Sequence, residues 1–206
     1  MLKVLGRTSS INVQKVMWVV GELGIEVDQT NIGGPYGGND KPEYLELNPN
    51  GRVPTIIDGD HIQWESNSCV RYLAESEGTG TWYPKTLQAR GFANMWMDWA
   101  TTTIHPHMFP LFWGLIRTAE EDKDHDAIEA ARVSLCDVRG LLDKHLATSK
   151  FLAGDDISMG DIPAACFAYR WHTLDIERPD LPNFRAWYDR IADRQAFQQH
   201  VMLPLV

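Results

Sequence analysis

Residues 48–73, "NPNGRVPTIIDGDHIQWESNSCVRYL", contain the most informative pattern in the chain. Two short β-rich apolar runs, "VPTIID" and "HIQW", meet at Asp58 and Gly59, which predicts a hairpin. A helix is expected directly afterwards, with Ser66 as its N-cap and Gly78 as its stop. Strand, strand and helix in this order predict the second half of a small α/β unit.

The residues that precede this stretch supply the first half of that unit. "LKVL", residues 2–5, is a short strand candidate. From Ile11 onward, apolar residues recur at helical spacing, and Gly24 stands where a helix C-cap belongs. A weaker strand is expected over residues 27–32, followed by a glycine-rich loop. Residues 1–78 therefore follow the order βαβ, loop, ββα.

The strand pattern disappears after this unit. "TGTWYPKTLQ", residues 79–88, is typical of a linker, and the remaining residues show helical spacing. Pro106 and Pro110 are expected to bend or break a long helical segment over 89–117. Ser158 followed by Asp161 resembles a capping box that opens a later helix. We therefore predict two domains, an α/β domain over 1–80 and an all-helical domain over 88–206.

Composition limits the classes of function. The chain has 206 residues, 44% of them hydrophobic, so it can bury a substantial core. Its net charge of -9 argues against binding to nucleic acid or an anionic membrane, because these require clustered Lys and Arg. No apolar run is long enough for a signal peptide or a membrane span, which predicts a cytoplasmic protein. The three cysteines are too far apart for a CxxC redox or zinc motif.

Several strings resemble those of the cytosolic glutathione transferases, in the same order along the chain. "NPNGRVPTIIDGD", residues 48–60, is similar to the family's "NPxGxVPxLxDG", and "ESNSCVRYL", residues 65–73, to its "ESxAIxxYL". "FLAGDDISMGDI", residues 151–162, resembles "(F)LxGxxxSxAD", and residues 185–197 resemble the closing helix. The resemblance implies an α/β thioredoxin-like N-terminal domain plus an all-α helical bundle. It also implies glutathione as co-substrate, detoxification by transfer to an electrophile, and a homodimer.

Proline at position 54 has a physical meaning of its own. Because proline cannot donate to a β-ladder, it belongs at a strand start or edge. Val53 can then offer its N–H and C=O to an extended peptide. The resemblance implies that Pro54 is cis and that Val53 pairs with the cysteinyl unit of glutathione. A simple strand-edge role explains Pro54 alone equally well.

Glu65 and Ser66 form a pair suited to a zwitterionic amino-acid head. A helix N-terminus favours carboxylates, and Glu65 can accept from an ammonium. The γ-glutamyl end of glutathione carries both charges. Lys41 and Arg52 are the nearest cations in sequence, suited to the glycyl carboxylate. The alternative is that Ser66 only caps the helix and Glu65 is only a favourable acid in its first turn.

The polar cluster "TSSIN", residues 8–12, has no general base or cysteine beside it. Hydroxyl and amide donors at a helix start suffice to stabilise a thiolate that belongs to the ligand. By resemblance to serine-type members we rank Ser10 first as donor, then Asn12, Ser9 and Thr8. The chain departs from the family pattern in having Asn12 where proline is common. The absence of a cysteine here favours conjugation over reduction through a mixed disulfide.

The electrophile pocket is expected where this loop faces the helical half. Residues 94–114 are rich in Trp and Met, which suit flat apolar compounds but also suit a core or a dimer contact. The predicted pocket rim consists of His107, Trp113, Trp171 and His172. We expect no metal, since His105 and His107 flank a proline without an acidic partner. Alternative functions are a dehalogenase, an ether-cleaving enzyme, an isomerase or a non-catalytic glutathione-binding module.

Overall fold

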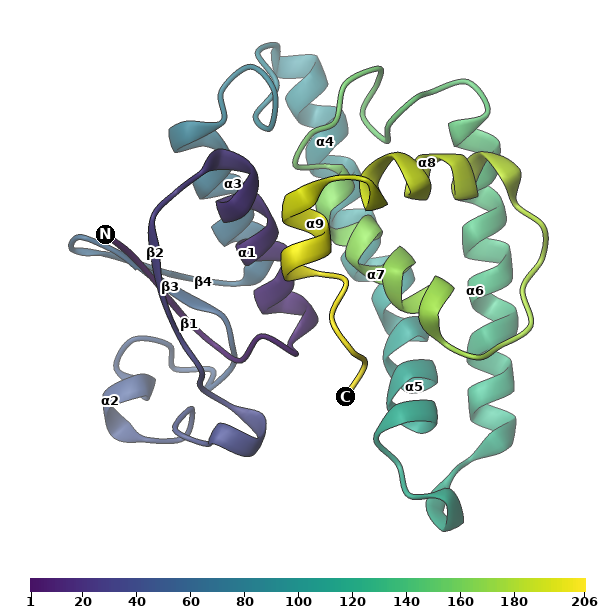
Figure 1. The fold of residues 1–206 in the computed structure, drawn as a ribbon, viewed down its shortest axis with the longest axis horizontal. Coiled ribbons are helices and arrows are strands. Elements are labelled where there is room, and N and C mark those ends of the chain that lie inside the picture. The colour runs from purple at the N-terminus through teal and green to yellow at the C-terminus, as the bar shows by residue number, and fades with distance from the viewer.

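A four-stranded mixed sheet forms the first half of the computed structural model, which describes residues 1–206. The strand order is β2-β1-β3-β4. Strand β1 (Leu2–Leu5) is parallel to β2 (Val27–Thr30) and antiparallel to β3 (Thr55–Asp58), and β3 pairs with β4 (His61–Trp64) in a hairpin. The sheet and its helices lie on one side of the molecule and the helical half on the other (Figure 1).

Two longer helices belong to this sheet, α1 (Ile11–Leu23) and α3 (Ser66–Glu77). The result is the expected thioredoxin-like βαβ-ββα order. Gly24 ends α1 in the left-handed conformation, with φ of 65°, as its C-cap position requires. The predicted cap of α3 was wrong by one residue: Glu65 is the N-cap and Ser66 is the first helical residue. The glycine-rich loop contains two short turns, η1 (Gly34–Tyr36) and α2 (Pro42–Leu45).

The prolines, which were expected to bend or break the segment 89–117, do not break it. Helix α4 (Leu87–Trp99) continues through a π-helical turn, η2 (Ala100–Ile104), into α5 (His105–Ile116). The wider π turn changes the hydrogen-bond register directly before Pro106, which stands in the first turn of α5, where its missing N–H is tolerated. Pro110 lies inside α5. The prolines are therefore accommodated in one long helical run.

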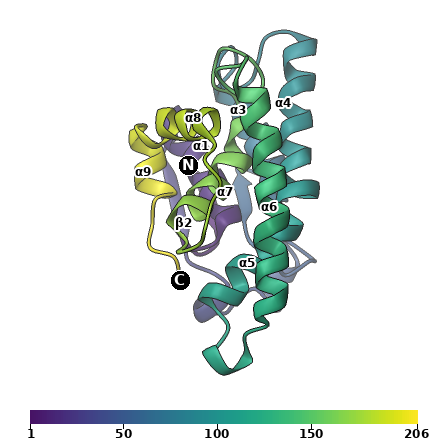
Figure 2. The same ribbon diagram turned by 90° about the vertical axis from the view of Figure 1, so that its right-hand side faces the viewer.

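The remaining elements complete a helical bundle. They are η3 (Glu120–Asp122), α6 (His125–Leu146), α7 (Asp161–Thr173), α8 (Pro182–Ala192) and α9 (Gln195–His200). Helix α7 is buried over most of its length, and α6 is the longest helix of the bundle (Figure 2). No helix is long and apolar enough to cross a membrane.

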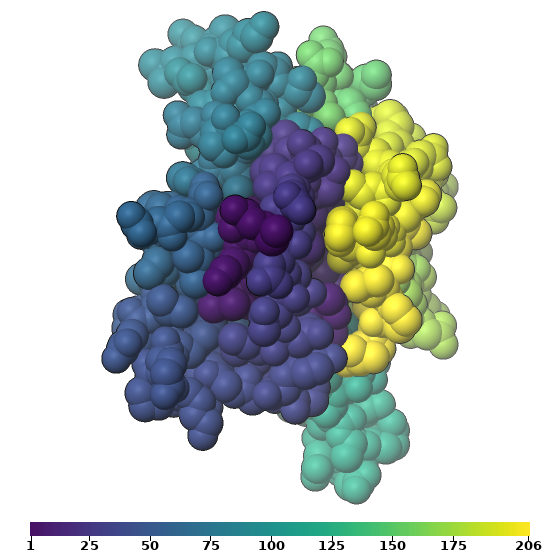
Figure 3. Space-filling model, turned by 60° about the vertical axis from the view of Figure 1, so that its left-hand side comes forward, coloured from purple at the N-terminus to yellow at the C-terminus, as the bar shows by residue number.

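Helix α1 joins the two halves, because it packs on α3 within the first half and on α7 and α9 of the second. Arg194 donates from Nε and Nη2 to the Glu22 carboxylate at 2.7 and 2.5 Å, and Trp18 Nε1 donates to the same carboxylate at 2.9 Å. Figure 3 shows the C-terminal segment lying along the N-terminal half. One continuous apolar core therefore includes residues of both halves.

Candidate active site

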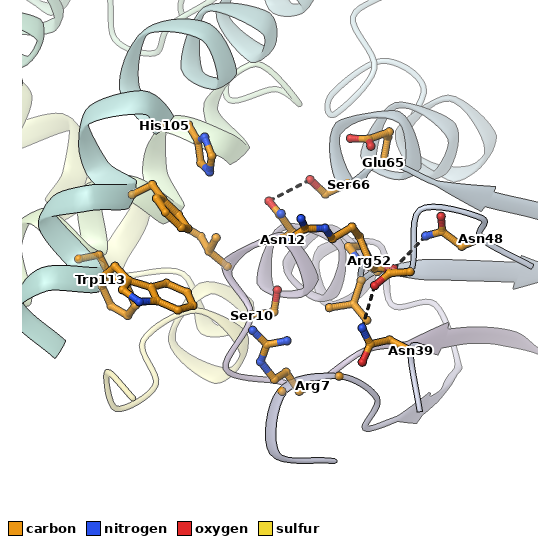
Figure 4. Close-up of a pocket in the computed structure, with 18 of the residues that line it drawn as sticks. Arg7, Ser10, Asn12, Asn39, Asn48, Arg52, Glu65, Ser66, His105 and Trp113 are labelled. Carbon is orange, nitrogen blue, oxygen red and sulfur yellow. Dashed lines mark hydrogen bonds between the residues drawn. The ribbon is translucent and has the colours of Figure 1, made fainter. Parts of the chain in front are cut away.

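A cleft of about 470 Å³ lies where the two halves meet. Its N-terminal side comes from the start of α1, the loops before α2 and β3, and the start of α3. Its C-terminal side comes from α5 and α7. Figure 4 shows Ser10, Asn12, Arg52 and Ser66 on the N-terminal side, with His105 and Trp113 opposite them.

Side chains of neighbouring residues hold the loop that precedes β3 through hydrogen bonds to its backbone. The Arg52 carbonyl accepts hydrogen bonds from the Tyr44 hydroxyl at 2.6 Å and from Asn48 Nδ2 at 2.8 Å. Asn39 Nδ2 donates to the Gly51 carbonyl at 2.8 Å. These bonds fix the backbone that enters the cleft.

This loop leaves a short open backbone edge. The Val53–Pro54 peptide bond is cis, and both residues line the cleft. Neither the N–H nor the C=O of Val53 has a hydrogen-bond partner within the protein. Val53 can therefore pair with an extended peptide by strand addition.

Glu65 has an unusual backbone conformation at the cleft. Its φ is 68°, and no other residue except glycine has a positive φ. Such conformations cost of order 1–3 kcal/mol and concentrate at functional sites. Glu65 and the N-terminus of α3 both face the cleft, so an acceptor for an ammonium and donors for a carboxylate stand next to each other.

Ser10 occupies the N-cap position of α1 without capping it. Its side chain makes no capping hydrogen bond, and the residue is only 8% exposed. The N–H groups of Ile11, Asn12 and Val13 also have no acceptor within the protein, as is usual in a first helical turn. The Ser10 hydroxyl and this helix start are therefore free to donate to an anion in the cleft.

Asn12 is held in one orientation by two donors. Lys15 Nζ donates to Asn12 Oδ1 at 2.9 Å, and the Ser66 hydroxyl donates to the same oxygen at 3.2 Å (Figure 4). Since both bonds use the oxygen, the amide nitrogen Nδ2 remains available as a donor. Burial lowers the pKa of Lys15 to about 8, and the residue is only 3% exposed.

The cleft is strongly cationic in a chain of net charge -9. Its charged lining comprises one acid, Glu65, and four arginines, Arg7, Arg52, Arg117 and Arg170. Burial, together with the nearby positive charges of Arg117 and Arg7, lowers the pKa of Arg170 to about 10. The site therefore favours anionic ligands.

An aromatic wall from α5 faces the polar side. It consists of Phe109, Phe112 and Trp113, with His105 beside them. The rings of Phe109 and Trp113 lie 5.2 Å apart between centroids, and Trp113 is 43% exposed. Desolvation and the charges of Lys15 and Arg170 lower the pKa of His105, which favours the neutral imidazole.

Eight of the residues singled out in the sequence line the cleft: Ser10, Asn12, Arg52, Val53, Pro54, Glu65, Ser66 and Trp113. The other candidates do not line it. Thr8 lines a separate cavity of about 320 Å³, while Ser9 and Lys41 belong to neither.

Three of the four residues expected at the pocket rim do not line the cleft. Trp171 is 1% exposed and packs in the core beside Arg139. His172 stacks on Phe184 and lies against Tyr188. The helical phase of α5 directs His105 and Phe109 to the cleft, and His107 is not among the lining residues.

The sequence reasoning missed one arginine of the N-terminal half and the cationic and aromatic residues of the helical half. They are Arg7, His105, Phe109, Phe112, Arg117 and Arg170. The i, i+4 spacing of His105, Phe109 and Trp113 on one helical face was a signal that could have identified the α5 residues. Arg170 had no such signal, because its position depends on how α7 packs.

A thioredoxin-like domain packed against an all-helical domain, with a cleft between them, is the arrangement of the glutathione-transferase class of protein. The family model described as "Glutathione S-transferase, N-terminal domain" matches residues 1–75, and the corresponding C-terminal domain model matches residues 97–195. The chain belongs to the glutathione S-transferase family.

Individual relatives agree with this assignment. The chain is 36% identical to glutathione S-transferase GstB of Escherichia coli K12, with 100% of both chains covered. It is 32% identical to glutathione S-transferase 3 of Zea mays, covering 97% of this chain and 93% of the relative. A theta class glutathione S-transferase from Xanthomonas axonopodis pv. citri, solved with glutathione bound, is 42% identical, with a TM-score of 0.97 and coverage of 100% and 99%.

Proposed function

We propose that this transferase binds glutathione in the cleft, forms its thiolate and transfers it to a small electrophile held against the α5 aromatic wall. The observation that supports this most directly is the convergence of an open peptide edge at Val53 and free donors at the start of α1 on one cleft. No acid, base or cysteine of the chain has to react.

The chemistry of glutathione fits the groups on the N-terminal side. Its cysteinyl unit would pair with the N–H and C=O of Val53 beside Pro54. Its γ-glutamyl head would place the ammonium at Glu65 and the carboxylate at the α3 N-terminus, beside Ser66. Its glycyl carboxylate would meet Arg52. The exposed Lys41 does not line the cleft and is left out of this proposal.

The energy needed to form the thiolate is within reach of these donors. A free cysteine thiol has a pKa of about 8.5, and lowering it by about two units needs roughly 2.7 kcal/mol. One neutral hydrogen bond contributes about 0.5–1.5 kcal/mol, and a helix N-terminus about 0.3–1 kcal/mol. Two donors and the start of α1 therefore suffice without a general base.

The two donors in the proposal are Ser10 Oγ and Asn12 Nδ2. The Ser10 hydroxyl is not engaged as a helix cap, and Asn12 is oriented by Lys15 and Ser66. Ser10, which lines the cleft, remains the first-ranked donor in this proposal. Ser9 and Thr8 drop out, because neither lines the cleft.

The transfer step forms one bond and breaks another at the electrophile. The thiolate sulfur attacks an electron-poor carbon, and the leaving group departs with its electron pair or, for an addition, the carbanion takes a proton from solvent. Phe109 and Trp113 offer the electrophile an apolar face, and His105 offers a neutral hydrogen-bonding group.

A second copy of the chain is the proposed partner. Helix α4 presents an exposed apolar stripe at i, i+3 and i+7, formed by Phe92 and Met95, which are 56% and 50% exposed, and the half-buried Trp99. An apolar stripe on one helix face is typical of a protein interface. A cytoplasmic location stays a prediction of the sequence.

The test of the catalytic proposal measures the turnover of Ser10→Ala, Asn12→Ala and a control variant, with 1-chloro-2,4-dinitrobenzene as a neutral electrophile. Ser10→Ala should raise the pKa of bound glutathione by about one unit and lower kcat about tenfold. Asn12→Ala should have a similar effect, while the KM for glutathione changes little in both. The thiolate absorbance near 240 nm, titrated against pH, reports the pKa directly.

The matched control is Ser9→Ala, which removes the neighbouring hydroxyl outside the cleft. It should leave kcat and the thiol pKa unchanged. If Ser10→Ala is silent while Asn12→Ala is not, the order of the two donors is reversed. Bound glutathione without thiolate absorbance near neutral pH in the unmodified protein would contradict the proposed mechanism as a whole.

A further inference from the structure

Arg170 is a buried cation without a partner. It is 8% exposed, yet it lines the cleft, and its Nε has no hydrogen-bond acceptor. No carboxylate lies within salt-bridge distance of its guanidinium. Its only close partner is an aromatic face, since Cζ lies 3.8 Å from the centroid of the Phe112 ring. A buried charge of this kind is costly unless an anion pairs with it.

Two further arginines line the cleft, Arg117 at the end of α5 and Arg7 on the N-terminal side. Arg117 lies over Phe112 and Trp113, with Cζ 5.4 and 4.9 Å from the ring centroids. Its Nε and Nη2 donate to the backbone oxygen of Val206 at 3.1 and 2.9 Å, which holds the guanidinium in place. All three arginines line the cleft, and the positive charges of Arg117 and Arg7 both help to lower the pKa of Arg170.

The loop opposite is shaped to admit the third arginine. A Cβ atom at Gly34, where φ is 58°, would stand 2.9 Å from Arg7 Nε. Glycine therefore serves both the backbone conformation and the close approach of Arg7. Glu65, the one acid of the cleft, belongs to the opposite end, beside Ser66.

Glutathione leaves these charges unused. In the proposed function its ammonium and two carboxylates meet Glu65, the α3 N-terminus and Arg52, and its thiolate meets Ser10 and Asn12. The arginines of the helical half lie instead among the α5 aromatic residues, where the electrophile is expected. Their positive charge is therefore available to the second substrate.

We infer that Arg170, in the same cleft as Arg117 and Arg7, binds a carboxylate on the electrophilic substrate, so that the enzyme selects small aromatic or unsaturated electrophiles that carry an anionic group. This inference rests on the proposed function. It replaces the wholly apolar electrophile that the sequence suggested with one that has an apolar body and a charged end. Phe109 and Trp113 hold the body, and Arg170 holds the carboxylate by charge-assisted hydrogen bonds.

A matched pair of substrates isolates the carboxylate. 4-Chloro-3-nitrobenzoate and 4-chloro-3-nitrobenzamide have the same ring, nitro group and leaving chloride. In both, the thiolate sulfur forms a bond to the ring carbon and chloride leaves with the bonding electrons. After division by the uncatalysed rate with glutathione, the unmodified enzyme should show kcat/KM about tenfold or more in favour of the benzoate.

Arg170→Gln should remove this preference and leave kcat/KM for the amide within about twofold. Arg117→Gln should also reduce the preference for the benzoate over the benzamide. The matched control is Arg90→Gln, which removes an arginine that lies over Tyr83 outside the cleft. It should leave both substrates unaffected. Inhibition of the unmodified enzyme by unreactive 3-nitrobenzoate and 3-nitrobenzamide provides a test that does not depend on any variant folding.

The outcomes distinguish a failure of this inference from a failure of the proposed glutathione transfer. Equal loss with both substrates in Arg170→Gln would mean that Arg170 serves the thiolate or the fold, which overturns the inference. Equal inhibition by the nitrobenzoate and the nitrobenzamide would overturn it as well. Failure of the proposed function would look different, since glutathione would then not react with 1-chloro-2,4-dinitrobenzene either.

Discussion

At the scale of single residues, the polar cluster at the start of α1 divides into residues that reach the cleft and residues that do not. Ser10 and Asn12 line it, whereas Thr8 and Ser9 do not. From the sequence, these four residues could be ranked as donors only through the resemblance to serine-type family members. The structure adds a group that the ranking did not contain, the buried ammonium of Lys15, which donates to Asn12.

Lys15 is expected to act as a positioning residue for Asn12. Lys15→Met removes the hydrogen bond to Asn12 Oδ1 and a positive charge near the cleft, so the pKa of bound glutathione should rise and kcat/KM should fall about tenfold. Lys15→Arg should restore part of the loss, because it keeps a cationic donor. The readout is the thiolate absorbance titration, together with kcat/KM for an uncharged electrophile.

Lys15 also makes the stability of the unmodified protein depend on pH in a defined direction. Burial lowers the pKa of Lys15 to about 8 in the folded protein, below its ordinary value of 10.5, while Cys166, Arg170 and Glu65 act on it by charge. The unfolded chain therefore binds more protons between these two values, and the stability contributed by Lys15 rises with pH across that window. The free energy of unfolding should show this rise in the unmodified protein and lack it in Lys15→Met.

An unchanged thiol pKa of bound glutathione in Lys15→Met would contradict the positioning role of Lys15.

At the scale of elements, local signals placed most helices and strands correctly but not their exact ends. The 3.6-residue spacing and Gly24 defined α1, and the hairpin followed from its two β-rich runs. The alternative that Pro106 and Pro110 break the helix was wrong, because the run continues through the π turn at Ala100–Ile104 into α5. Sequence spacing does not reveal such a turn, since it depends on packing around it.

The start of α7 depends on one buried carboxylate. Asp161 Oδ2 accepts from the Ser158 N–H at 3.0 Å, and Oδ1 accepts from the Leu152 N–H and Trp187 Nε1, both at 2.9 Å. Only the reach of Asp161 back to Ser158 was foreseeable from the capping-box pattern. The other two bonds tie α7 to the preceding loop and to α8.

Asp161→Ala should destabilise the protein by about 3–5 kcal/mol, because it leaves three buried donors without acceptors. Urea unfolding followed by circular dichroism measures the loss. The control is Asp189→Ala on α8, which removes only an exposed pair with Arg185 and should cost less than about 1 kcal/mol. Similar losses in the two variants would show that the α7 capping network does not contribute as described.

At the scale of the whole molecule, the cleft exists only because two halves pack against each other. Its polar side comes from the N-terminal half, and its aromatic wall and two of its arginines come from α5 and α7. Helix α1 and the Glu22–Arg194 pair hold the halves together. The domain boundary between residues 80 and 88 stays a prediction of the sequence.

The proposed homodimer is the prediction at this scale. The unmodified protein should sediment at twice the chain mass of 23.4 kDa at micromolar concentration. Phe92→Glu combined with Met95→Glu should shift it toward the monomer, because two charges would be buried in the interface. Leu141→Glu places one charge on an exposed apolar position of α6 and should leave the mass unchanged. A monomeric unmodified protein would contradict the proposal.

The fold class, the order of the elements and most residues on the N-terminal side of the cleft could be predicted from the sequence. These features depend on short-range patterns: periodicity, turn residues, and the motifs around Pro54 and Ser66. The arginines and aromatic residues on the C-terminal side of the cleft became evident only from the folded structure. Arg170 faces the cleft because α7 packs against α1 and α5. Only this packing places Arg170 in the same cleft as Arg117 and Arg7. Residues far apart in the chain can be recognised as one anion site only after folding brings them together.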